Sequence, residues 1–465
     1  MRSHQDSRFQ LSFFKGGWPS HAPPAITRPI HYLGSKLRIV NQICELLDRL
    51  DPTYGPVCDL FAGSGTVSKA LSLKRDVIAV DIQEYSRVLC SAILNPAECD
   101  PDSIEDFVWR ISSSEHFKIL SWALEPLMNF EEKCLSMAST GDLEPLCDLL
   151  ENGSLIAFES SAYHTTNPLL LAARKDVESR LREVQLIDSP SSLVTRYFGG
   201  IYFAYSQACQ LDVLLEAVAN LPPSQRDTFL AAILSTASEI VNTVGKQFAQ
   251  PLRPRSSSGE PKADLFEMVS RDRLSNVMDV YKSWLKRYVT VPKTGRSHMA
   301  IRQDYREALK NLNGEVKIVY ADPPYTRDHY SRYYHVLETL CLRDNPTIST
   351  MRTNGKEQLS RGIYRADRYQ SEFCIKSKAP MAFSKLFSEV RQLNVPLVLS
   401  YSPYDVGSRS RPRLMTIEEI LTLAKEYFSQ IITLTPGRIA HSKLTNAEKI
   451  VEPSYDAEML LVCKP

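Results

Sequence analysis

The strongest constraint on the fold of this chain comes from two neighbouring stretches that share one pattern. PVCDLFAGSGTVSKALSL (56–73) and DVIAVDIQEYSRVLCSAIL (76–94) each begin with a short apolar strand, pass through a turn and end in a helix. Strands that alternate with helices form a parallel sheet with helices on both faces. Strand-like segments return later in the chain, at residues 316–322, 395–402, 430–436 and 457–464. We therefore expect an α/β domain built from the N-terminal third and the C-terminal half of the chain.

The middle of the chain has a different character. From residue 101 to about residue 222 it is rich in Leu, Glu, Ser and Ala and has no convincing strand, which predicts a largely helical insertion. The spacing of apolar residues predicts further helices at 36–50, 226–241 and 416–427. The expected organisation is a flexible leader (1–27), a first part of the sheet domain (28–100), the inserted region (101–300) and a second part of the sheet domain (301–465).

Composition limits the classes of function. The 465 residues are 43% hydrophobic and 23% charged, which are ordinary values for globular proteins. A formal net charge of +1 gives no bulk attraction for a polyanion, so a nucleic-acid surface would need local clusters of Lys and Arg. The ten cysteines form no CxxC pair and the histidines show no metal-ligand spacing, so we expect reduced thiols and no metal. No apolar run reaches the ~20 residues of a membrane span, which predicts a soluble, cytoplasmic protein.

A glycine-rich turn, DLFAGSGTVS, follows the first strand. Gly63 and Gly65 open the helix after it, where a ligand can approach exposed backbone N–H groups. The Lys-Ser/Thr of a phosphate-binding P-loop is absent, and Ser68 stands where a dinucleotide fingerprint needs its third glycine. A nucleoside cofactor without pyrophosphate remains, with Asp81 at the end of the next strand placed to accept hydrogen bonds from ribose hydroxyls. S-adenosyl-L-methionine fits this description, and an ordinary strand-turn-helix corner is the open alternative.

A proline corner, Asp322-Pro323-Pro324-Tyr325, ends the strand IVYA. Proline donates no backbone hydrogen bond, so the two prolines stop the strand and form a rigid loop at its carboxyl edge, where ligands bind in open α/β sheets. The Asp322 carboxylate and the Pro323 carbonyl offer two acceptors beside the flat ring of Tyr325. This arrangement suits an exocyclic amine on a base, whose nitrogen would then attack the methyl group of a sulfonium. The alternative is a surface turn that contains these four residues by chance.

Three motifs in this order, HYLGSK (31–36), DLFAGSGT (59–66) and DPPY (322–325), resemble the Dam-like (D12 class, α-group) DNA adenine-N6 methyltransferases. The resemblance covers about residues 29–95 and 300–465. It implies a Rossmann-like S-adenosylmethionine-dependent methyltransferase sheet with helices on both faces, interrupted here by a large, mainly helical insertion that would include target recognition. It also implies a cofactor site made of Tyr32, Lys36, Asp59, Phe61, Gly63, Gly65, Asp81, Asp304 and Tyr305, beside catalytic residues Asp322, Pro323, Pro324 and Tyr325.

An adenine in duplex DNA reaches such a pocket only after it is flipped out, so the protein needs contacts to the DNA backbone. The densest basic cluster is in residues 271–302, where aromatic residues are interleaved with Arg271, Arg273, Lys282, Lys286, Arg287, Lys293 and Arg296. Phosphate binding is one interpretation of this cluster, and a solvated basic helix face is the other. Residues 351–370 and 408–413 are further candidates. Tyr330, Tyr333, Tyr334 and His335 are candidates for stacking on the flipped base, with core packing as the alternative.

The sequence therefore predicts a site-specific DNA methyltransferase that transfers a methyl group from S-adenosyl-L-methionine to the N6 amine of a flipped adenine in double-stranded DNA. A restriction endonuclease that acts on the same site is a possible partner. Methyltransferases of RNA adenine N6, DNA cytosine N4 or a protein amide are alternative enzymes. A non-catalytic DNA-binding subunit of a restriction or defence complex is the alternative from another class.

Overall fold

The computed structural model describes residues 28–159, 165, 167–312, 314–327, 329–353, 356–402, 413–436 and 458–465. The predicted leader at 1–27 lies outside these residues, as does the basic segment 408–413 except for Arg413. Each of the ten cysteines is a free thiol. Among the described residues, no helix has both the length and the apolar character that a membrane span requires.

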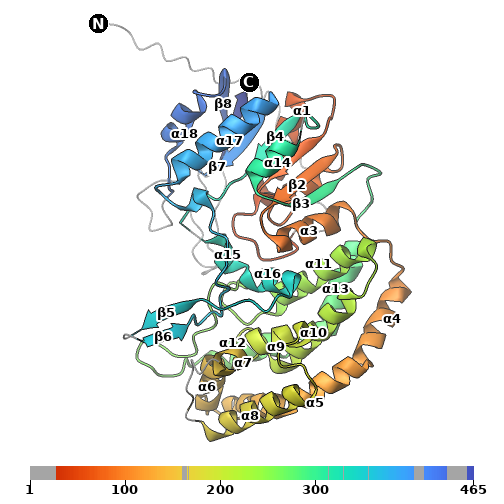
Figure 1. Ribbon diagram of the computed structural model, residues 1–465, viewed down its shortest axis with the longest axis vertical. Coiled ribbons are helices and arrows are strands. Elements are labelled where there is room, and N and C mark those ends of the chain that lie inside the picture. Colours follow the sequence, from red (N-terminus) through yellow and green to blue (C-terminus); the bar gives the residue numbers. More distant parts are fainter. Residues whose placement is uncertain are drawn as a thin grey trace.

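A seven-stranded, mainly parallel sheet forms the upper part of the molecule (Figure 1). Its strands are β1 (Val57–Leu60), β2 (Val77–Asp81), β3 (Met299–Arg302), β4 (Ile318–Ala321), β7 (Leu397–Tyr401), β8 (Gln430–Leu434) and β9 (Met459–Lys464). They lie in the order β3-β2-β1-β4-β7-β9-β8, and β9 alone runs antiparallel to both of its neighbours. Because β1, β2 and β4 are parallel neighbours, their carboxyl ends meet at one edge of the sheet.

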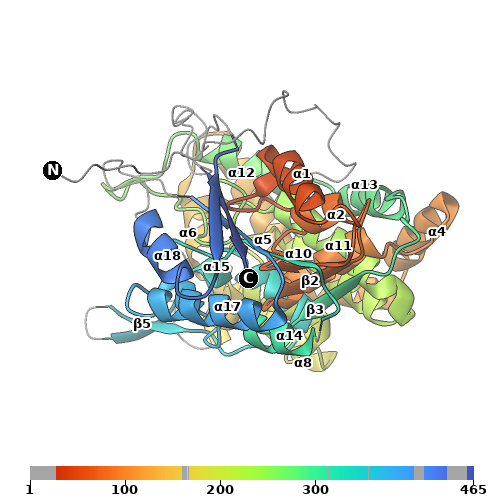
Figure 2. The ribbon, with the colours of Figure 1, turned by 90° about the horizontal axis from the view of Figure 1, so that it is seen from above.

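Helices cover both faces of this sheet. One face carries α1 (Val40–Leu50), α2 (Thr66–Leu71) and α3 (Glu84–Leu94), and the other carries α14 (Tyr305–Asn311), α17 (Ala379–Leu393) and α18 (Ile417–Ala424). Figure 2 shows α1 and α2 on the side opposite α14 and α17. Neighbouring strand residues alternate between the two faces, so Val57 packs in the first core and Cys58 in the second. Both are fully buried, as expected for strands with helices on both sides.

The helices between β2 and β3 form the lower part of the molecule in Figure 1. Those after α3 are α4 (Pro101–Ser112), α5 (Glu115–Ser139), α6 (Glu144–Asn152), α7 (Leu155–Glu159), α8 (Pro168–Glu183), α9 (Leu193–Phe198), α10 (Tyr205–Ala219), α11 (Pro223–Ile240), α12 (Leu265–Arg273) and α13 (Val277–Val289). Helix α11 packs against α3, and their contact includes a bidentate ion pair in which Arg87 donates to both carboxylate oxygens of Asp227 at 2.8 Å. One continuous apolar core therefore joins these helices to the sheet.

A smaller group of elements lies between the sheet and the lower helices. Helices α15 (Tyr330–Tyr333) and α16 (His335–Leu342) follow β4, and the antiparallel hairpin of β5 (Thr350–Thr353) and β6 (Lys356–Leu359) follows α16. Glu338 of α16 accepts hydrogen bonds from the backbone N–H groups of Glu84 and Tyr85. These bonds satisfy donors at the N-terminus of α3 and hold α16 against the carboxyl edge of β2.

The predicted α/β architecture is confirmed, with a mainly parallel sheet and helices on both faces. The described residues between α3 and β3 contain no strand of two or more residues, as predicted. The helix expected from residue 36 begins as a single 3-10 turn at Lys36–Arg38, and α1 follows it. The sequence patterns did not reveal β3, which is short and half-exposed, nor the β5–β6 hairpin, which lies outside the sheet.

Candidate active site

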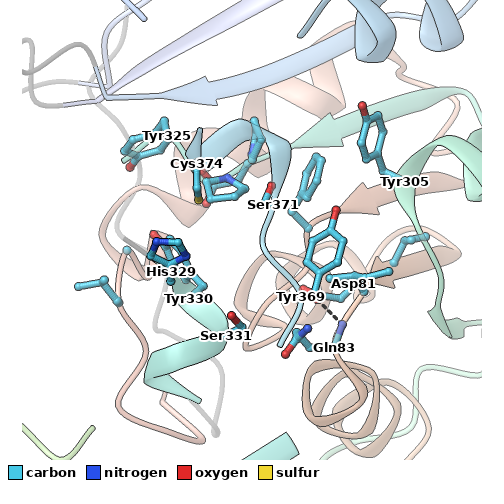
Figure 3. Close-up of a pocket in the computed structure, with 18 of the residues that line it drawn as sticks. Asp81, Gln83, Tyr305, Tyr325, His329, Tyr330, Ser331, Tyr369, Ser371 and Cys374 are labelled. Carbon is cyan, nitrogen blue, oxygen red and sulfur yellow. Dashed lines mark hydrogen bonds between the residues drawn. The ribbon is translucent and has the colours of Figure 1, made fainter. Parts of the chain in front are cut away.

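A cavity opens at the shared carboxyl edge of β1, β2 and β4. The empty space in it, counted together with the open solvent at its mouth, is about 910 Å³. In Figure 3, Tyr325, His329 and Tyr330 lie on one side of this cavity, and Tyr305 and Asp81 lie on the other. Ten of the residues proposed from the sequence line it: Tyr32, Lys36, Phe61, Asp81, Asp304, Tyr305, Asp322, Pro323, Pro324 and Tyr325.

Three charged side chains meet beneath the proline corner. Lys36 Nζ lies 2.9 Å from Asp322 Oδ2 and 3.3 Å from Glu458 Oε1. Glu458 is the residue directly before β9, and its Oε1 also accepts a hydrogen bond of 2.7 Å from the Ser400 hydroxyl. Lys36 and Glu458 are buried, so little solvent screens their interaction. The other oxygen of Asp322, Oδ1, is buried and has no hydrogen-bond partner among the described residues.

The charge balance of this group determines how Asp322 titrates. One ammonium is shared by two carboxylates, which leaves a net charge of −1 when all three side chains are ionised. Burial raises the pKa of Asp322 to about 6, the positive charge of Lys36 opposes this rise, and the negative charge of Glu458 adds to it. The two carboxylates raise the pKa of Lys36 well above its usual value despite its burial, so the lysine stays charged. Above pH 6, Asp322 therefore presents an ionised, unpaired oxygen.

The ring of Tyr325 is fixed beside this group. It makes an edge-to-face contact with Tyr401, at 5.1 Å between ring centroids. The guanidinium of Arg413 lies 4.8 Å from the centre of the ring and Lys36 Nζ lies 5.5 Å from it. Two cations close to the ring are attracted to its negative face, so the position of the tyrosine depends on the charges around it as well as on its packing.

The glycine-rich turn and Tyr32 fit closely together. Gly63 has a φ of +56°, and a Cβ atom at this position would lie 2.4 Å from the Tyr32 hydroxyl. The backbone N–H of Gly63 donates to Asp81 Oδ2 at 3.0 Å, and Gln83 donates its backbone N–H to Asp81 Oδ1 at 2.9 Å. Tyr32 in turn stacks on Tyr334, with 5.1 Å between centroids and 13° between planes. Glycine at 63 is therefore needed both for its backbone angle and for the space that Tyr32 occupies.

Aromatic side chains form the opposite end of the cavity. The rings of Phe61 and Tyr305 lie 5.4 Å apart, and Phe373 meets Phe61 edge-on at the same distance. Phe61 has a φ of +61°, which is rare for a side chain of this size and common at functional positions. Asp304 caps the start of α14, and its Oδ1 accepts from the backbone and the side chain of Arg306. These flat surfaces provide a place for a planar heterocycle.

Three of the predicted cofactor residues, Asp59, Gly63 and Gly65, do not line the cavity. Two of them lie behind the turn. Asp59 is buried behind it and accepts a hydrogen bond from Ser68. Burial raises the pKa of Asp59 to about 7. Gly65 has a φ of +75° and lies against Ile93 of α3, where a Cβ atom would be 2.4 Å from the isoleucine Cδ1. In the structure both residues shape the turn from behind, and direct contact with a cofactor stays a prediction.

Most of the basic cluster at 271–302 is paired with acids. Arg273 is buried and binds Glu131, and Arg271 lies 3.1 Å from Asp272. The remaining partners are Glu105 for Lys282 and Lys286, Glu98 for Lys293, and the ring of Trp284 for Arg287; Arg296 is exposed. The interleaved Tyr281 and Tyr288 are fully buried core residues. This geometry favours the alternative of a solvated helix face, and DNA contact at this cluster stays a prediction.

The aromatic run after the proline corner divides between the site and the core. Tyr330 lines the cavity. Tyr334 supports Tyr32, and Tyr333 is buried. His335 is also buried, and its Nε2 lies 3.2 Å from the Phe248 carbonyl. Burial lowers the pKa of His335 to about 3, so this histidine is a neutral core residue.

Sequence reasoning missed Glu458, Phe373 and Glu338. No local motif marks any of them. The one signal for Glu458 was that an acidic residue stands directly before the last apolar strand. A buried lysine such as Lys36 needs a counter-ion, and this acid could supply it.

Comparison with protein families supports the assignment that the three motifs suggested. Residues 32–120 and 265–393 match the family described as D12 class N6 adenine-specific DNA methyltransferase. This chain is similar to the D12 class over these two segments.

Three DNA-modifying methyltransferases are among the proteins similar to this chain. It is 32% identical over 178 residues to the modification methylase LlaI of Lactococcus lactis subsp. lactis, a match that covers 36% of this chain and 25% of that methylase. It is 22% identical over 386 residues to the type II methyltransferase M.CviAII of Paramecium bursaria Chlorella virus 1, which covers 82% of this chain and 85% of that enzyme. It is also 22% identical to the modification methylase StsI of Streptococcus sanguinis, over 33% of this chain and 22% of that methylase. The chain therefore spans a quarter or less of the LlaI and StsI methylases, and most of M.CviAII.

Proposed function

We propose that this protein is a site-specific DNA methyltransferase that transfers a methyl group from S-adenosyl-L-methionine to the N6 amine of adenine. The observation that carries the proposal is Asp322 Oδ1, a buried carboxylate oxygen without a partner among the described residues, on a side chain that lines the cavity next to Tyr325. An unpaired acceptor in such a place is costly unless a ligand uses it. An exocyclic amine is the donor that matches it.

The cofactor part of the proposal depends on the other end of the cavity. We place the adenine of the cofactor against Phe61 and Tyr305, which Phe373 supports from behind, and its ribose near Asp81. The strand order, with one antiparallel strand at β9 beside the edge strand, supports a Rossmann-like methyltransferase sheet. Parallel sheets of this type bind nucleosides at the carboxyl edge of the strands, where this cavity lies.

The residues around Asp322 would prepare the amine for reaction. Lys36 holds Oδ2 at 2.9 Å and leaves Oδ1 without a partner among the described residues, so Oδ1 is available to accept a hydrogen bond from a ligand. Hydrogen bonds from the amine to Oδ1 and to the carbonyl of Pro323 would keep the nitrogen lone pair available for attack. Bound S-adenosylmethionine supplies an electrophilic methyl group on a sulfonium sulfur. Lys36, Asp322 and Glu458 together carry a net charge of −1, which favours a cation nearby. In-line positioning of the amine and the methyl donor accounts for much of the rate.

We further propose that the substrate is double-stranded DNA with the adenine flipped out, and that the helices α4–α13 take part in target recognition. The modification methylases among the relatives support a restriction-modification setting, in which an endonuclease acts on the same site in the cytoplasm. The basic cluster at 271–302 is a weaker candidate for DNA contact than its sequence suggested, because acids neutralise most of it.

The proposal is tested by expressing the protein in cells without adenine methylation and sequencing their DNA with detection of modified bases. The expected result is N6-methyladenine in one sequence context. Asp322→Ala should abolish the modification while the purified variant still binds S-adenosylmethionine in calorimetry. Glu426→Ala, which removes an exposed acid between α18 and β8, is the matched control and should leave methylation intact. Methylcytosine, methylated RNA alone, or full activity in the Asp322 variant would overturn the proposal.

A further inference from the structure

Four arginines surround Tyr364 at the junction between the sheet and the lower helices. The guanidinium of Arg368 lies 4.7 Å from the centre of the Tyr364 ring, and that of Arg332 lies 5.8 Å from it. Burial raises the pKa of the Tyr364 hydroxyl, and the positive charges of Arg332, Arg368, Arg253 and Arg361 all oppose this rise. We call Arg253, Arg332, Arg361 and Arg368 the Tyr364 arginine cluster.

The cluster comes from three separate parts of the chain. Arg253 belongs to the segment after α11, Arg332 to α15, and Arg361 and Arg368 to the segment after β6. Hydrogen bonds to backbone carbonyls hold these parts together, because the Tyr364 hydroxyl donates to Ala249 and Arg361 donates to Leu252. The arginines are therefore brought together by the fold, on a scaffold that packing fixes.

These arginines have no acidic counter-ion within the part of the chain that the structure describes. None of the four makes an ion pair with a described residue, although their neighbour Arg365 is paired with Asp344 and Asp367. Arg332 Nε and Arg368 Nη1 are buried and have no hydrogen-bond partner. Burial and the neighbouring charge of Arg332 both lower the pKa of Arg368. Like charges held together without acids imply an anionic ligand.

The cluster flanks the candidate active site. Arg332 follows Tyr330 and Ser331, which line the cavity, and Arg368 precedes Tyr369, which also lines it. Figure 3 shows Tyr330 and Ser331 on the side of the cavity away from Tyr305, and Tyr369 beside Asp81. A second cavity adjoins the first, and Ser331, Arg368 and Tyr369 are part of its wall. An anion bound by these arginines would therefore lie beside a base that enters the first cavity.

We propose that the Tyr364 arginine cluster binds the phosphates next to the flipped nucleotide in duplex DNA. This inference rests on the proposed function. The planar fork of arginine matches a phosphate group and gives two parallel hydrogen bonds. Contacts to phosphates fix the position of the protein on DNA without reading the sequence. The cluster would hold the strand in place while the adenine rotates into the cavity beside Asp322 and Tyr325.

The inference is tested with the double variant Arg332→Gln/Arg368→Gln and a short fluorescent DNA duplex. The duplex contains the sequence that the wild-type protein methylates. The logarithm of the DNA affinity is measured against the logarithm of the salt concentration. Each lost phosphate contact should make the slope shallower by about 0.9, so the double variant should lose about 1.8. The affinity should fall equally for duplexes with and without the site, because phosphate contacts carry no sequence information.

The control is Lys74→Gln/Lys425→Gln, which removes two exposed cations that precede β2 and β8, at the edge of the sheet opposite the cavity. This variant should keep the slope of the wild-type protein. S-adenosylmethionine binding should be unchanged in both variants, which shows that the cofactor half of the cavity is intact. An unchanged slope in the arginine variant overturns the inference even if the wild-type protein methylates DNA. If the wild-type protein does not methylate DNA at all, the proposed function fails instead.

Discussion

Replacement of Asp322 by Asn should stabilise the protein while removing its activity. The buried carboxylate has a pKa of about 6 in the folded protein against an ordinary value of 3.8, because burial and Glu458 outweigh Lys36. The folded state therefore binds more protons than the unfolded state between these two values, and the stability falls as the pH rises through this range. At about 1.36 kcal/mol for each pKa unit, the difference of about 2.2 corresponds to about 3 kcal/mol above pH 6. Asn has nearly the same shape and no charge, so Asp322→Asn should recover up to about 3 kcal/mol of stability at pH 8.

The assay is denaturant unfolding of the wild-type protein and the Asp322→Asn variant at pH 8 and at a pH below 4. The variant should be more stable at pH 8, and the difference should shrink at low pH, where the wild-type carboxyl is neutral. Methyl transfer should fall at least about 100-fold, because an amide accepts hydrogen bonds more weakly than a carboxylate. Asp344→Asn is the control, and its effect on stability should have the opposite sign. A hydrogen bond from Arg365 lowers the pKa of Asp344, so loss of the Asp344 charge should destabilise the protein. A variant at position 322 that is less stable than the wild-type protein at pH 8 would show that Lys36 fully compensates the carboxylate, and would refute the reasoning.

Three further predictions follow from the site. Glu458→Gln should lower the pKa of Asp322, because the negative charge of Glu458 raises that pKa. The acid limb of the pH profile of kcat/KM should therefore move to lower pH. If the acid limb does not move, Glu458 and Asp322 are not coupled. Gly63→Ala should destabilise the protein by about 1–3 kcal/mol through its positive φ and should weaken S-adenosylmethionine binding in calorimetry, because the added methyl group displaces Tyr32. Glu338→Ala should cost about 1–2 kcal/mol in thermal unfolding, because the N-terminus of α3 loses two hydrogen bonds, and an unchanged Tm would show that water replaces them.

The family and the position of the site were accessible from the sequence because their signals are local. A short apolar strand followed by glycines or prolines can be recognised in about ten residues, and parallel strands bring their carboxyl ends to one edge of the sheet. The match to the D12 class confirms the family suggested by these motifs. The cavity between Asp81 and Asp322 lies where this reasoning placed it, although the roles of the individual residues stay predictions.

Lys36 shows where local reasoning ended. The sequence assigned this lysine to the cofactor, whereas its closest contacts in the structure are Asp322 and Glu458. Glu458 comes from the opposite end of the chain, and no spacing in the sequence connects it to Lys36. Phe373 joins Phe61 in the same way, through a segment that the motifs do not include.

The two basic clusters show most clearly what the sequence determined and what the fold decided. The sequence determined how many Lys and Arg residues each segment carries, and on that count residues 271–302 were the leading candidate for DNA. The tertiary structure determined which of these charges are neutralised. Segments distant in sequence supply Glu98, Glu105 and Glu131 to residues 271–302, whereas no described acid pairs with Arg332 or Arg368. The physical reason is that an electrostatic field depends on distances in space, and distances between residues far apart in sequence exist only once the chain has folded.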